Sequence, residues 1–399
     1  MTGQDGRSAM PFAALRDGLA LLDQKALRRS RRTLQSAQSA HVVVDGKRYV
    51  AFCSNDYLGL ANHPALIAAA QQGATQFGVG AGASHLVLGH VRPHEQLELE
   101  LARFVGLPRA LLFSTGYMAN LGIVTALAGR DDAVFADRLN HASLNDACLL
   151  ARARFKRYAH NDLTQLERLL ANTTARRRLI VVDAVFSMDG DIAPVPQLLA
   201  LAERYDAWLV LDDAHGFGVL GAGGRGVLEH FAVQHPRIVY MATLGKAAGV
   251  CGAFVAGDDM LIEWLMQRAR TYIYTTALPP LLAAALLKSL GLIANGNALR
   301  ERLREIISQL NKILESNMPK EWRLLPSITA IQPLVVGANQ VALTLAERLA
   351  ARGVLVPAIR PPTVPQGSAR LRISLSAAHS ADDVRQLGDG LIEAGQQSS

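Results

Sequence analysis

The chain has 399 residues and a mass of 42.9 kDa, is 50% hydrophobic and 19% charged, and has a mean hydropathy of +0.16. These values exclude disordered, collagen-like and coiled-coil classes and indicate a globular protein. A chain of this length is expected to divide into two or three domains, enough to build an enzyme.

Targeting signals are not evident in the sequence. The apolar stretch at 277–287 is too short for a membrane helix, contains two prolines and ends at Lys288. Charged residues interrupt the first twenty positions, so these lack the apolar block of a secretory signal. Cys53, Cys148 and Cys251 lie far apart without metal-binding or disulfide spacing. We therefore expect a cytoplasmic protein that uses no membrane and no metal.

The basic residues are unevenly distributed between the two types. The formal net charge is +7, and 34 of the 41 basic residues are arginines. Arginine clusters at 28–32 and 176–178 raise the alternative of a nucleic-acid-binding module. No aromatic residues are interleaved with these clusters, which favours a solvated face or an acidic protein partner over nucleic acid.

The pattern of apolar runs divides the chain into three parts. Residues 1–60 are expected to form an N-terminal arm, and residues 61–285 a large α/β domain. In that domain the expected strands are 110–113, 133–136, 179–186, 208–211, 238–243 and 252–256. Because these runs are almost continuously apolar, they predict a mostly parallel sheet with helices on both faces.

Residues 286–399 show a different pattern and are expected to form a smaller C-terminal α+β domain. It begins with a charged helix at 298–316 and closes with a helix from Ala381. The expected strands lie at 328–336, 354–360 and 371–375. In the parallel sheet of the large domain, ligands are expected outside the carboxyl ends of the strands.

Lys246 is the most informative single residue. It is the only charged residue between Arg237 and Asp258 and lies between two apolar strands. Burial without a partner lowers the pKa of a lysine and yields the nucleophilic amine that Schiff-base chemistry requires. The alternative is a lysine that extends from a loop into solvent, but the surrounding glycine, alanine and strand residues favour the chemical role.

A second group of polar residues ends the strand at 208–211, where Asp212, Asp213 and His215 follow in close succession. A carboxylate at a strand end can keep a pyridinium nitrogen protonated, which is the usual protein contact of a pyridoxal phosphate (PLP) ring. A helix cap and a surface histidine are the alternatives. A metal site is weakly supported, because only two ligands lie at this spacing.

The segment 216–221 matches the dinucleotide-binding pattern G-x-G-x-x-G. That pattern requires a helix starting inside the glycines and an acidic residue about 20 positions later. Here the chain continues through further glycines to Gly226, and no acidic residue lies between Glu229 and Asp258. A nicotinamide enzyme is therefore only a remote alternative.

An anion site is indicated where the strand at 110–113 ends. Ser114 and Thr115 form a hydroxyl-rich turn, and Gly116 opens a helical pattern. Free backbone N–H groups and the helix dipole favour a phosphate at such a position. His141 and Ser187 follow neighbouring strands and are expected to reach the same crevice.

Six motifs combine these observations. They are NDYLGL at 55–60, GYxAN at 116–120, HAS at 141–143, FSMDGD at 186–191, DDAHG at 212–216 and TxGK at 243–246. In this order, and over nearly the whole chain, they resemble the α-oxoamine synthases, which are PLP-dependent transferases of fold type I. Segments 358–365 and 369–379 are similar to the branch that acts in biotin biosynthesis. This resemblance implies condensation of L-alanine with a pimeloyl thioester.

The resemblance implies catalytic roles for four residues. Lys246 would bind PLP as a Schiff base, and Asp212 would pair with the pyridinium nitrogen. His141 would stack on the ring face, and His215 would contact the phenolic oxygen. Asp183 stands where the family often has glutamate, so a shorter acid must reach the contacts of that glutamate.

Further cofactor contacts are implied for Ser187 at the phenolic oxygen, and for Thr243, Gly116 and Tyr117 at the phosphate.

Substrate contacts are implied for Arg360 with the alanine carboxylate, and for Thr363, Arg28 and His141 around it. The family is typically homodimeric. The acyl group would be carried by coenzyme A or by an acidic acyl carrier protein, which the basic arm would suit. The alternative is another member of the family that uses glycine or serine with a different acyl-CoA.

Overall fold

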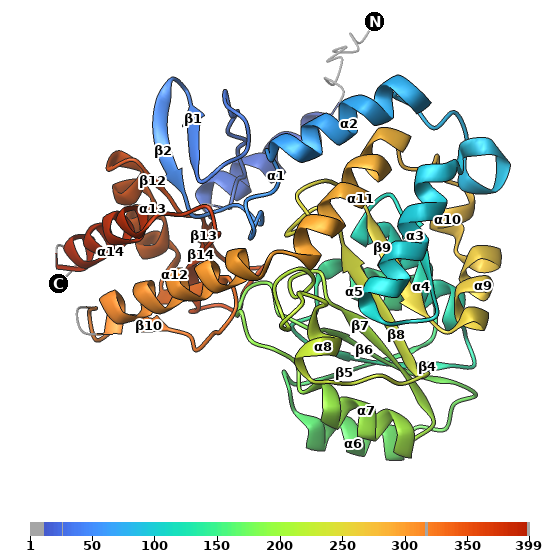
Figure 1. Cartoon of the computed structure of the whole chain (residues 1–399). Helices are drawn as coiled ribbons and strands as arrows, with labels where there is room; N and C mark the ends of the chain where they lie inside the picture. The colour runs from blue at the N-terminus through green and yellow to red at the C-terminus, as the bar shows by residue number, and fades with distance from the viewer. Residues whose placement is uncertain (1–11, 26, 316–317, 397–399) are drawn as a thin grey trace, which may run out of the picture.

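The computed structural model describes residues 12–25, 27–315 and 318–396 (Figure 1). Its centre is a seven-stranded sheet with the strand order β3-β9-β8-β7-β6-β4-β5. The strands are β3 (Arg109–Phe113), β4 (Ala133–Asp137), β5 (Arg154–Tyr158), β6 (Arg178–Asp183), β7 (Ala207–Asp212), β8 (Ile238–Thr243) and β9 (Ala253–Gly257). Only β9 runs antiparallel to its two neighbours, β3 and β8, so the expected mostly parallel sheet is confirmed.

Both faces of this sheet are buried, because side chains of a strand alternate between them. In β6, Ile180 and Val182 pack into one core cluster, and Leu179 and Val181 pack into the other. The first cluster includes residues from α3 (Arg92–Val105), α6 (Leu163–Ala171), α7 (Val195–Arg204) and α11 (Pro280–Ala294). The second includes residues from α4 (Gly116–Leu127), α5 (Ala142–Leu150) and α9 (Asp259–Arg268). Helices therefore cover both faces, as Figure 1 shows.

The C-terminal part forms a second sheet with the order β10-β11-β14-β13. Its strands are β10 (Arg323–Leu324), β11 (Ile331–Gly337), β13 (Ala358–Ile359) and β14 (Ala369–Ser374). Three helices accompany this sheet, α12 (Asn297–Glu315), α13 (Asn339–Ala351) and α14 (Ala381–Gln396). The α+β pattern expected here is present, whereas the exact domain boundaries stay a prediction.

The N-terminal arm joins the C-terminal part through a third sheet. Strands β1 (His41–Val44) and β2 (Lys47–Ala51) form a hairpin, and β2 pairs in parallel with β12 (Val354–Leu355). The remaining helices are α1 (Ala13–Gln24), α2 (Pro64–Phe77), the π-helix η1 (His85–Gly89), α8 (Val227–His230) and α10 (Arg270–Ile273). Among the described residues, no single helix is long and apolar enough to cross a membrane.

Several strand predictions differ from the structure. The strand predicted at 328–336 begins later, at Ile331 of β11, and the short strands β1, β2 and β10 were not predicted. The predicted strand at 179–186 ends at Asp183, and β5 was not predicted because Arg154, Lys156 and Arg157 hide its apolar pattern. The predicted strand at 354–360 is divided into β12 and β13. Pro357 separates the two, because it has no N–H for a strand hydrogen bond. The end of the charged helix predicted at 298–316 lies outside the described residues, at position 316.

Candidate active site

A cavity of about 200 Å³ lies at the carboxyl ends of β4, β6, β7 and β8 and at the start of α4. Eight residues named from the sequence line it, namely Gly116, Tyr117, His141, Ser187, Asp212, His215, Thr243 and Lys246. Their sequence positions span 130 residues, and parallel strands bring them together because all these strands end at the same edge of the sheet.

Lys246 follows β8, and its amine Nζ lies 2.8 Å from Nε2 of His215. Burial lowers the pKa of Lys246 to about 8, although the Asp212 and Asp183 carboxyl groups oppose this shift. Burial also lowers the pKa of His215 well below its ordinary value, with a further contribution from Lys246. His215 is therefore a neutral imidazole, and Lys246 is an amine that can lose its proton near physiological pH.

Asp212 ends β7 with both carboxylate oxygens engaged. Its Oδ2 accepts a hydrogen bond of 2.7 Å from the Asn120 amide, and its Oδ1 accepts one of 3.0 Å from the Ala214 N–H. These two bonds fix the plane of the carboxylate, and each oxygen retains a second lone pair for a ligand. Asp212 can therefore hold a protonated nitrogen in the cavity.

Asp183 lies beside Asp212 at the end of the neighbouring strand β6. Its Oδ2 accepts a hydrogen bond of 3.0 Å from the backbone N–H of His141. The His141 side chain accepts a hydrogen bond from the Ser143 N–H and so caps α5. Burial lowers the pKa of His141, although Asp212 opposes this effect. The ring of His141 is thus held at the wall of the cavity by two local contacts.

The start of α4 supplies the anion-binding feature expected from the sequence. Thr115 caps this helix, since its side chain accepts a hydrogen bond of 3.1 Å from the Met118 N–H. The first-turn amides of Gly116 and Tyr117 have no acceptor within the helix and adjoin the cavity. Thr243 lines the other side, with its hydroxyl bonded to the Gly252 carbonyl at 3.0 Å.

Three predicted substrate contacts are not among the residues that line the cavity. Arg28 pairs with Asp23 at 2.7 Å on the exposed arm. Arg360 follows β13, and its buried Nε has no hydrogen-bond partner. Thr363 donates its backbone N–H to the Arg360 carbonyl. The roles of these three residues in substrate binding stay predictions.

The structure adds cavity residues that the sequence analysis did not name for this site: Asn120, Ser143, Asp183, Val185, Ala214 and Met241. Asn120 and Ser143 lie within motifs that were recognised, so their presence in those motifs was the available signal. Asp183 was noted only as a departure from the family pattern. Tyr57, the partner of His215 at Nδ1, is not among the residues that line the cavity, and its only sequence signal was its place in the motif at 55–60.

The donor set fits PLP. Two buried oxygens among the lining residues, Asn120 Oδ1 and Asp183 Oδ1, have no hydrogen-bond partner, which indicates that a polar ligand completes the site. Lys246 would supply an amine for the cofactor's carbonyl carbon, Asp212 a carboxylate for its ring nitrogen, and the α4 N-terminus a phosphate site.

The glycine-rich segment 216–226 does not form a dinucleotide-binding turn. Gly218, Gly221, Gly224 and Gly226 all have positive φ angles between 76° and 85°, so the chain turns repeatedly instead of entering a helix. The next helix, α8, has only four residues. This geometry agrees with the sequence argument against a nicotinamide cofactor.

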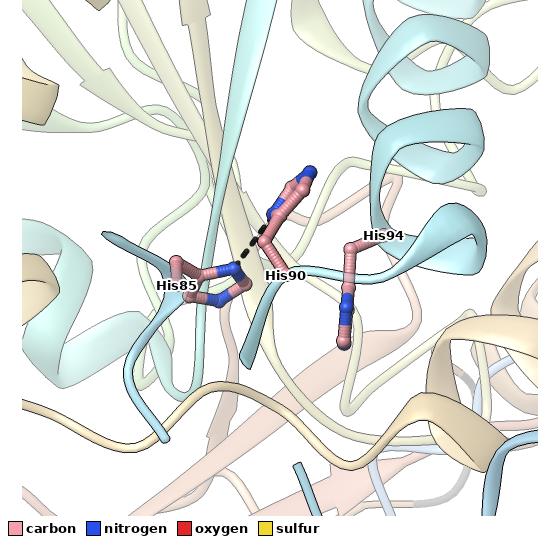
Figure 2. A group of neighbouring side chains, drawn as sticks. All are labelled: His85, His90 and His94. Carbon is pink, nitrogen blue, oxygen red and sulfur yellow. Dashed lines mark hydrogen bonds between the residues drawn. The ribbon is translucent and has the colours of Figure 1, made fainter. Parts of the chain in front are cut away.

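Figure 2 shows another group of histidines, His85, His90 and His94, none of which lines this cavity. Nδ1 of His85 lies 2.9 Å from Nδ1 of His90. Both nitrogens of His94 are engaged, because Nδ1 accepts the Val91 N–H and Nε2 contacts the Leu278 carbonyl at 2.6 Å. These bonds tie η1 to the start of α3 and to the segment before α11, so His94 has a structural role here.

Comparison with known proteins defines the class. The model of the aminotransferase class I and II family matches residues 47–391, and the chain belongs to this family. A Sphingomonas wittichii serine palmitoyltransferase has 30% sequence identity and a TM-score of 0.91, covering 97% of this chain and 98% of that one. A serine palmitoyltransferase structure solved with PLP matches with a TM-score of 0.90 and the same identity and coverage. The fold is therefore fold type I, and the cofactor of this class is PLP.

The curated relatives indicate a particular enzyme within this class. The 8-amino-7-oxononanoate synthase of Nitrosospira multiformis is 63% identical over 95% of both chains. That of Nitrosomonas europaea is 62% identical over 96% of this chain and 100% of the relative. The structure of the Francisella tularensis 8-amino-7-oxononanoate synthase has 31% identity and a TM-score of 0.77, covering 88% and 98% of the two chains. The expected resemblance to the α-oxoamine synthases is thus confirmed at the level of the 8-amino-7-oxononanoate synthases.

Proposed function

We propose that this enzyme condenses L-alanine with a pimeloyl thioester to give 8-amino-7-oxononanoate, CO₂ and the free thiol carrier, a step of biotin biosynthesis. The observation that carries this proposal is the arrangement of Lys246, Asp212 and His141 around one cavity at the strand ends, in a chain 63% identical to an 8-amino-7-oxononanoate synthase. The serine palmitoyltransferases are less similar in sequence, at 30% identity.

PLP, when bound, supplies a conjugated ring that withdraws electrons from the α-carbon of an amino acid. Asp212 would hold a proton at the ring nitrogen, because its carboxylate is fixed by Asn120 and Ala214. Lys246 would anchor the cofactor and, once released as a free amine, accept the proton of the alanine α-carbon. Its pKa of about 8 suits both roles, since the protonated and neutral forms are both populated near neutral pH.

The remaining residues orient the reactants. His141 would cover one face of the cofactor ring, with its position set by Asp183 and Ser143. His215 and Ser187 would contact the phenolic oxygen. Thr243 and the first amides of α4 would bind the phosphate. Arg360 would bind the alanine carboxylate, a role supported by its unpartnered buried Nε.

The test is a product assay on the purified enzyme with PLP. Pimeloyl-CoA is supplied with L-alanine, glycine or L-serine in turn, and products are identified by mass spectrometry. We expect 8-amino-7-oxononanoate with L-alanine as the preferred amino acid, and no turnover in Lys246→Ala. Borohydride reduction followed by peptide mapping should place the cofactor on Lys246. Preference for glycine or serine would instead identify another α-oxoamine synthase.

We also propose that the enzyme works as a homodimer. Exposed apolar side chains support this, because Leu86, Val87 and Leu88 of η1 lie next to one another on the surface and Val79 precedes them. An exposed group of this kind is typical of a protein interface. Light scattering after size-exclusion chromatography should give a mass near twice 42.9 kDa, and Val87→Glu should lower it.

The acyl carrier is proposed from charge. The exposed arginines that follow α1, among them Arg29, Arg31 and Arg32, would attract an acidic acyl carrier protein. With pimeloyl-carrier protein as substrate, kcat/KM should fall as salt rises from about 50 to 300 mM, whereas with pimeloyl-CoA the dependence should be weaker. Equal salt dependence for both substrates would contradict this role. We propose a cytoplasmic location, because the curated relatives are named as enzymes of biosynthesis.

A further inference from the structure

A continuous line of hydrogen bonds runs from the amine of Lys246 to the C-terminal sheet. Lys246 Nζ lies 2.8 Å from His215 Nε2, and His215 Nδ1 lies 2.7 Å from the Tyr57 hydroxyl. The Tyr57 hydroxyl lies 3.1 Å from Asn55 Oδ1. Two nitrogens of the Arg372 guanidinium lie 3.3 Å from the same Asn55 oxygen. The line joins the N-terminal arm, the large sheet and strand β14.

The direction of each hydrogen bond in the line follows from Arg372, the residue at the end farthest from Lys246. A guanidinium can only donate, so Asn55 must present its carbonyl oxygen to Arg372. Tyr57 contacts that same oxygen and must therefore donate its single hydroxyl proton to Asn55. With this proton committed, the Tyr57 oxygen can only accept from His215. Arg372 Nη2, 3.5 Å from this oxygen, adds a second donor to it.

This polarity decides the tautomer of His215. Its Nδ1 must carry the hydrogen that is donated to Tyr57, and the imidazole is neutral, so Nε2 has a free lone pair. That lone pair faces Lys246. We propose that Tyr57 is a positioning residue that fixes His215 as the Nδ1–H tautomer and thereby keeps Nε2 as the acceptor for the Lys246 amine. Asn55 and Arg372 orient Tyr57 for this role.

The environment of the line leaves little freedom for other arrangements. Tyr57 is 1% exposed and His215 is 9% exposed, so water has little access to exchange these bonds. Arg372 is itself held by Ser374 Oγ at 2.7 Å and by the Ser187 carbonyl. An Nε2–H tautomer would point a hydrogen at the Lys246 ammonium, so that two donors face each other. It would also leave the Nδ1 lone pair facing the Tyr57 oxygen, whose proton is donated to Asn55, so that two acceptors face each other.

The first test reads the tautomer directly. In protein labelled with ¹⁵N at histidine, long-range ¹H–¹⁵N spectra distinguish Nδ1–H from Nε2–H, and the variant His215→Asn assigns the signal. We expect Nδ1–H in the full-length wild-type enzyme freed of PLP, in which Lys246 is an amine 2.8 Å from Nε2. In Tyr57→Phe we expect at least half of the Nδ1–H population to be lost. Tyr205→Phe, whose hydroxyl contacts Glu167 on another part of the molecule, is the matched control and should leave the signal unchanged.

A conservative variant separates positioning from mere packing. Asn55→Asp keeps an oxygen acceptor for Tyr57 and a partner for Arg372, so it should retain the Nδ1–H signal. Nδ1–H retained in Tyr57→Phe, or Nε2–H in the wild type, would overturn the proposal. The wild-type spectrum decides the matter even if Tyr57→Phe does not fold.

The catalytic consequence rests on the proposed function. Tyr57→Phe should lower kcat by roughly tenfold or more and shift its pH profile, while KM for L-alanine changes less. The tautomer does not depend on the substrate. An enzyme that shows the Nδ1–H signal but makes no product from L-alanine would therefore contradict the proposed function alone.

Discussion

Asp183 and Asp212 occupy paired positions at the ends of the adjacent parallel strands β6 and β7. The two acids differ in their surroundings. Asp212 is bonded by Asn120 and Ala214, whereas Asp183 accepts only the His141 N–H and has one unpartnered buried oxygen. Burial and the nearby Asp212 raise the pKa of Asp183 well above its ordinary value. Asp183 is thus the acid of the pair whose protonated form is favoured by its surroundings.

The raised pKa of Asp183 predicts a pH-dependent effect of Asp183→Asn. An acid whose pKa is higher in the folded than in the unfolded state loses folding stability as pH rises from about 4 towards the folded value. Asparagine cannot ionise, so the Tm of the variant relative to wild type should increase between about pH 5 and pH 8. Calorimetry over this range is the measurement. Asp131→Asn, at an exposed site, should show no such trend, and a constant difference for Asp183→Asn would refute the prediction.

Replacing Asp212 with asparagine tests the role of its charge. The rate of the holoenzyme should fall by roughly 10²–10³-fold, because the variant loses the charge that, in the proposed function, would hold a proton at the ring nitrogen. The matched control is Asp213→Asn next to it. Asp213 accepts hydrogen bonds from Tyr240 and Val227, so this change should mainly lower stability. Steady-state rates and urea unfolding separate the two effects, and similar rate losses in both variants would count against Asp212.

His160 gives a second pH prediction, away from the cavity. Burial opposes its charge, but hydrogen bonds to Asp137 and Asp191 prevail and raise the pKa of His160 to about 10. Its charged form therefore stabilises the fold fully below about pH 6.5, and this contribution is lost as pH rises towards 10. His160→Gln should lower Tm most at pH 6, with the gap to wild type closing by pH 10. A difference in Tm between His160→Gln and wild type that widens as pH rises would contradict the predicted direction.

Gly226 should tolerate no side chain. Its φ is +85°, and a Cβ there would lie 2.0 Å from Asp213 Oδ2 and 2.6 Å from the Tyr240 hydroxyl. Gly226→Ala therefore adds left-handed backbone strain of about 1–2 kcal/mol to the loss of the Asp213 hydrogen bonds, about 1–3 kcal/mol each. Gly46→Ala isolates the strain, because Gly46 has φ +73° and open space around its Cβ position. Urea unfolding should show a clearly larger loss for Gly226→Ala than for Gly46→Ala.

The sequence predicted the large sheet well where burial is uniform. The strand expected at 238–243 coincides with β8, because every residue before Thr243 is buried and the pattern has no interruption. The edge strand β5 was missed, since Lys156 and the arginines beside it are polar at the rim of the sheet. The break between β12 and β13 follows from Pro357, whose effect on a strand hydrogen bond outweighed the apolar pattern around it.

The residues that line the cavity could be predicted from the sequence, whereas the residues that hold them in position could not. Lys246, Asp212 and His141 each follow a strand in sequence, so the rule that ligands bind at strand ends is enough to group them. Tyr57 is 158 positions from His215, and no periodicity or local motif encodes that contact. It results from the packing of the arm against β14, which is a tertiary effect.

The pairing of β2 with β12 determines the order in which contacts can form while the chain is being synthesised. Asn55 and Arg372 are 317 positions apart, and β2 cannot pair until residues 354–355 have been synthesised. Because translation proceeds from the N-terminus, Lys246 and His215 leave the ribosome before the arm has a partner strand. Lys246 thus acquires its final hydrogen-bond environment only in a nearly full-length chain. Fragments that end before β14 are expected to have the cavity residues without the arrangement that orients them.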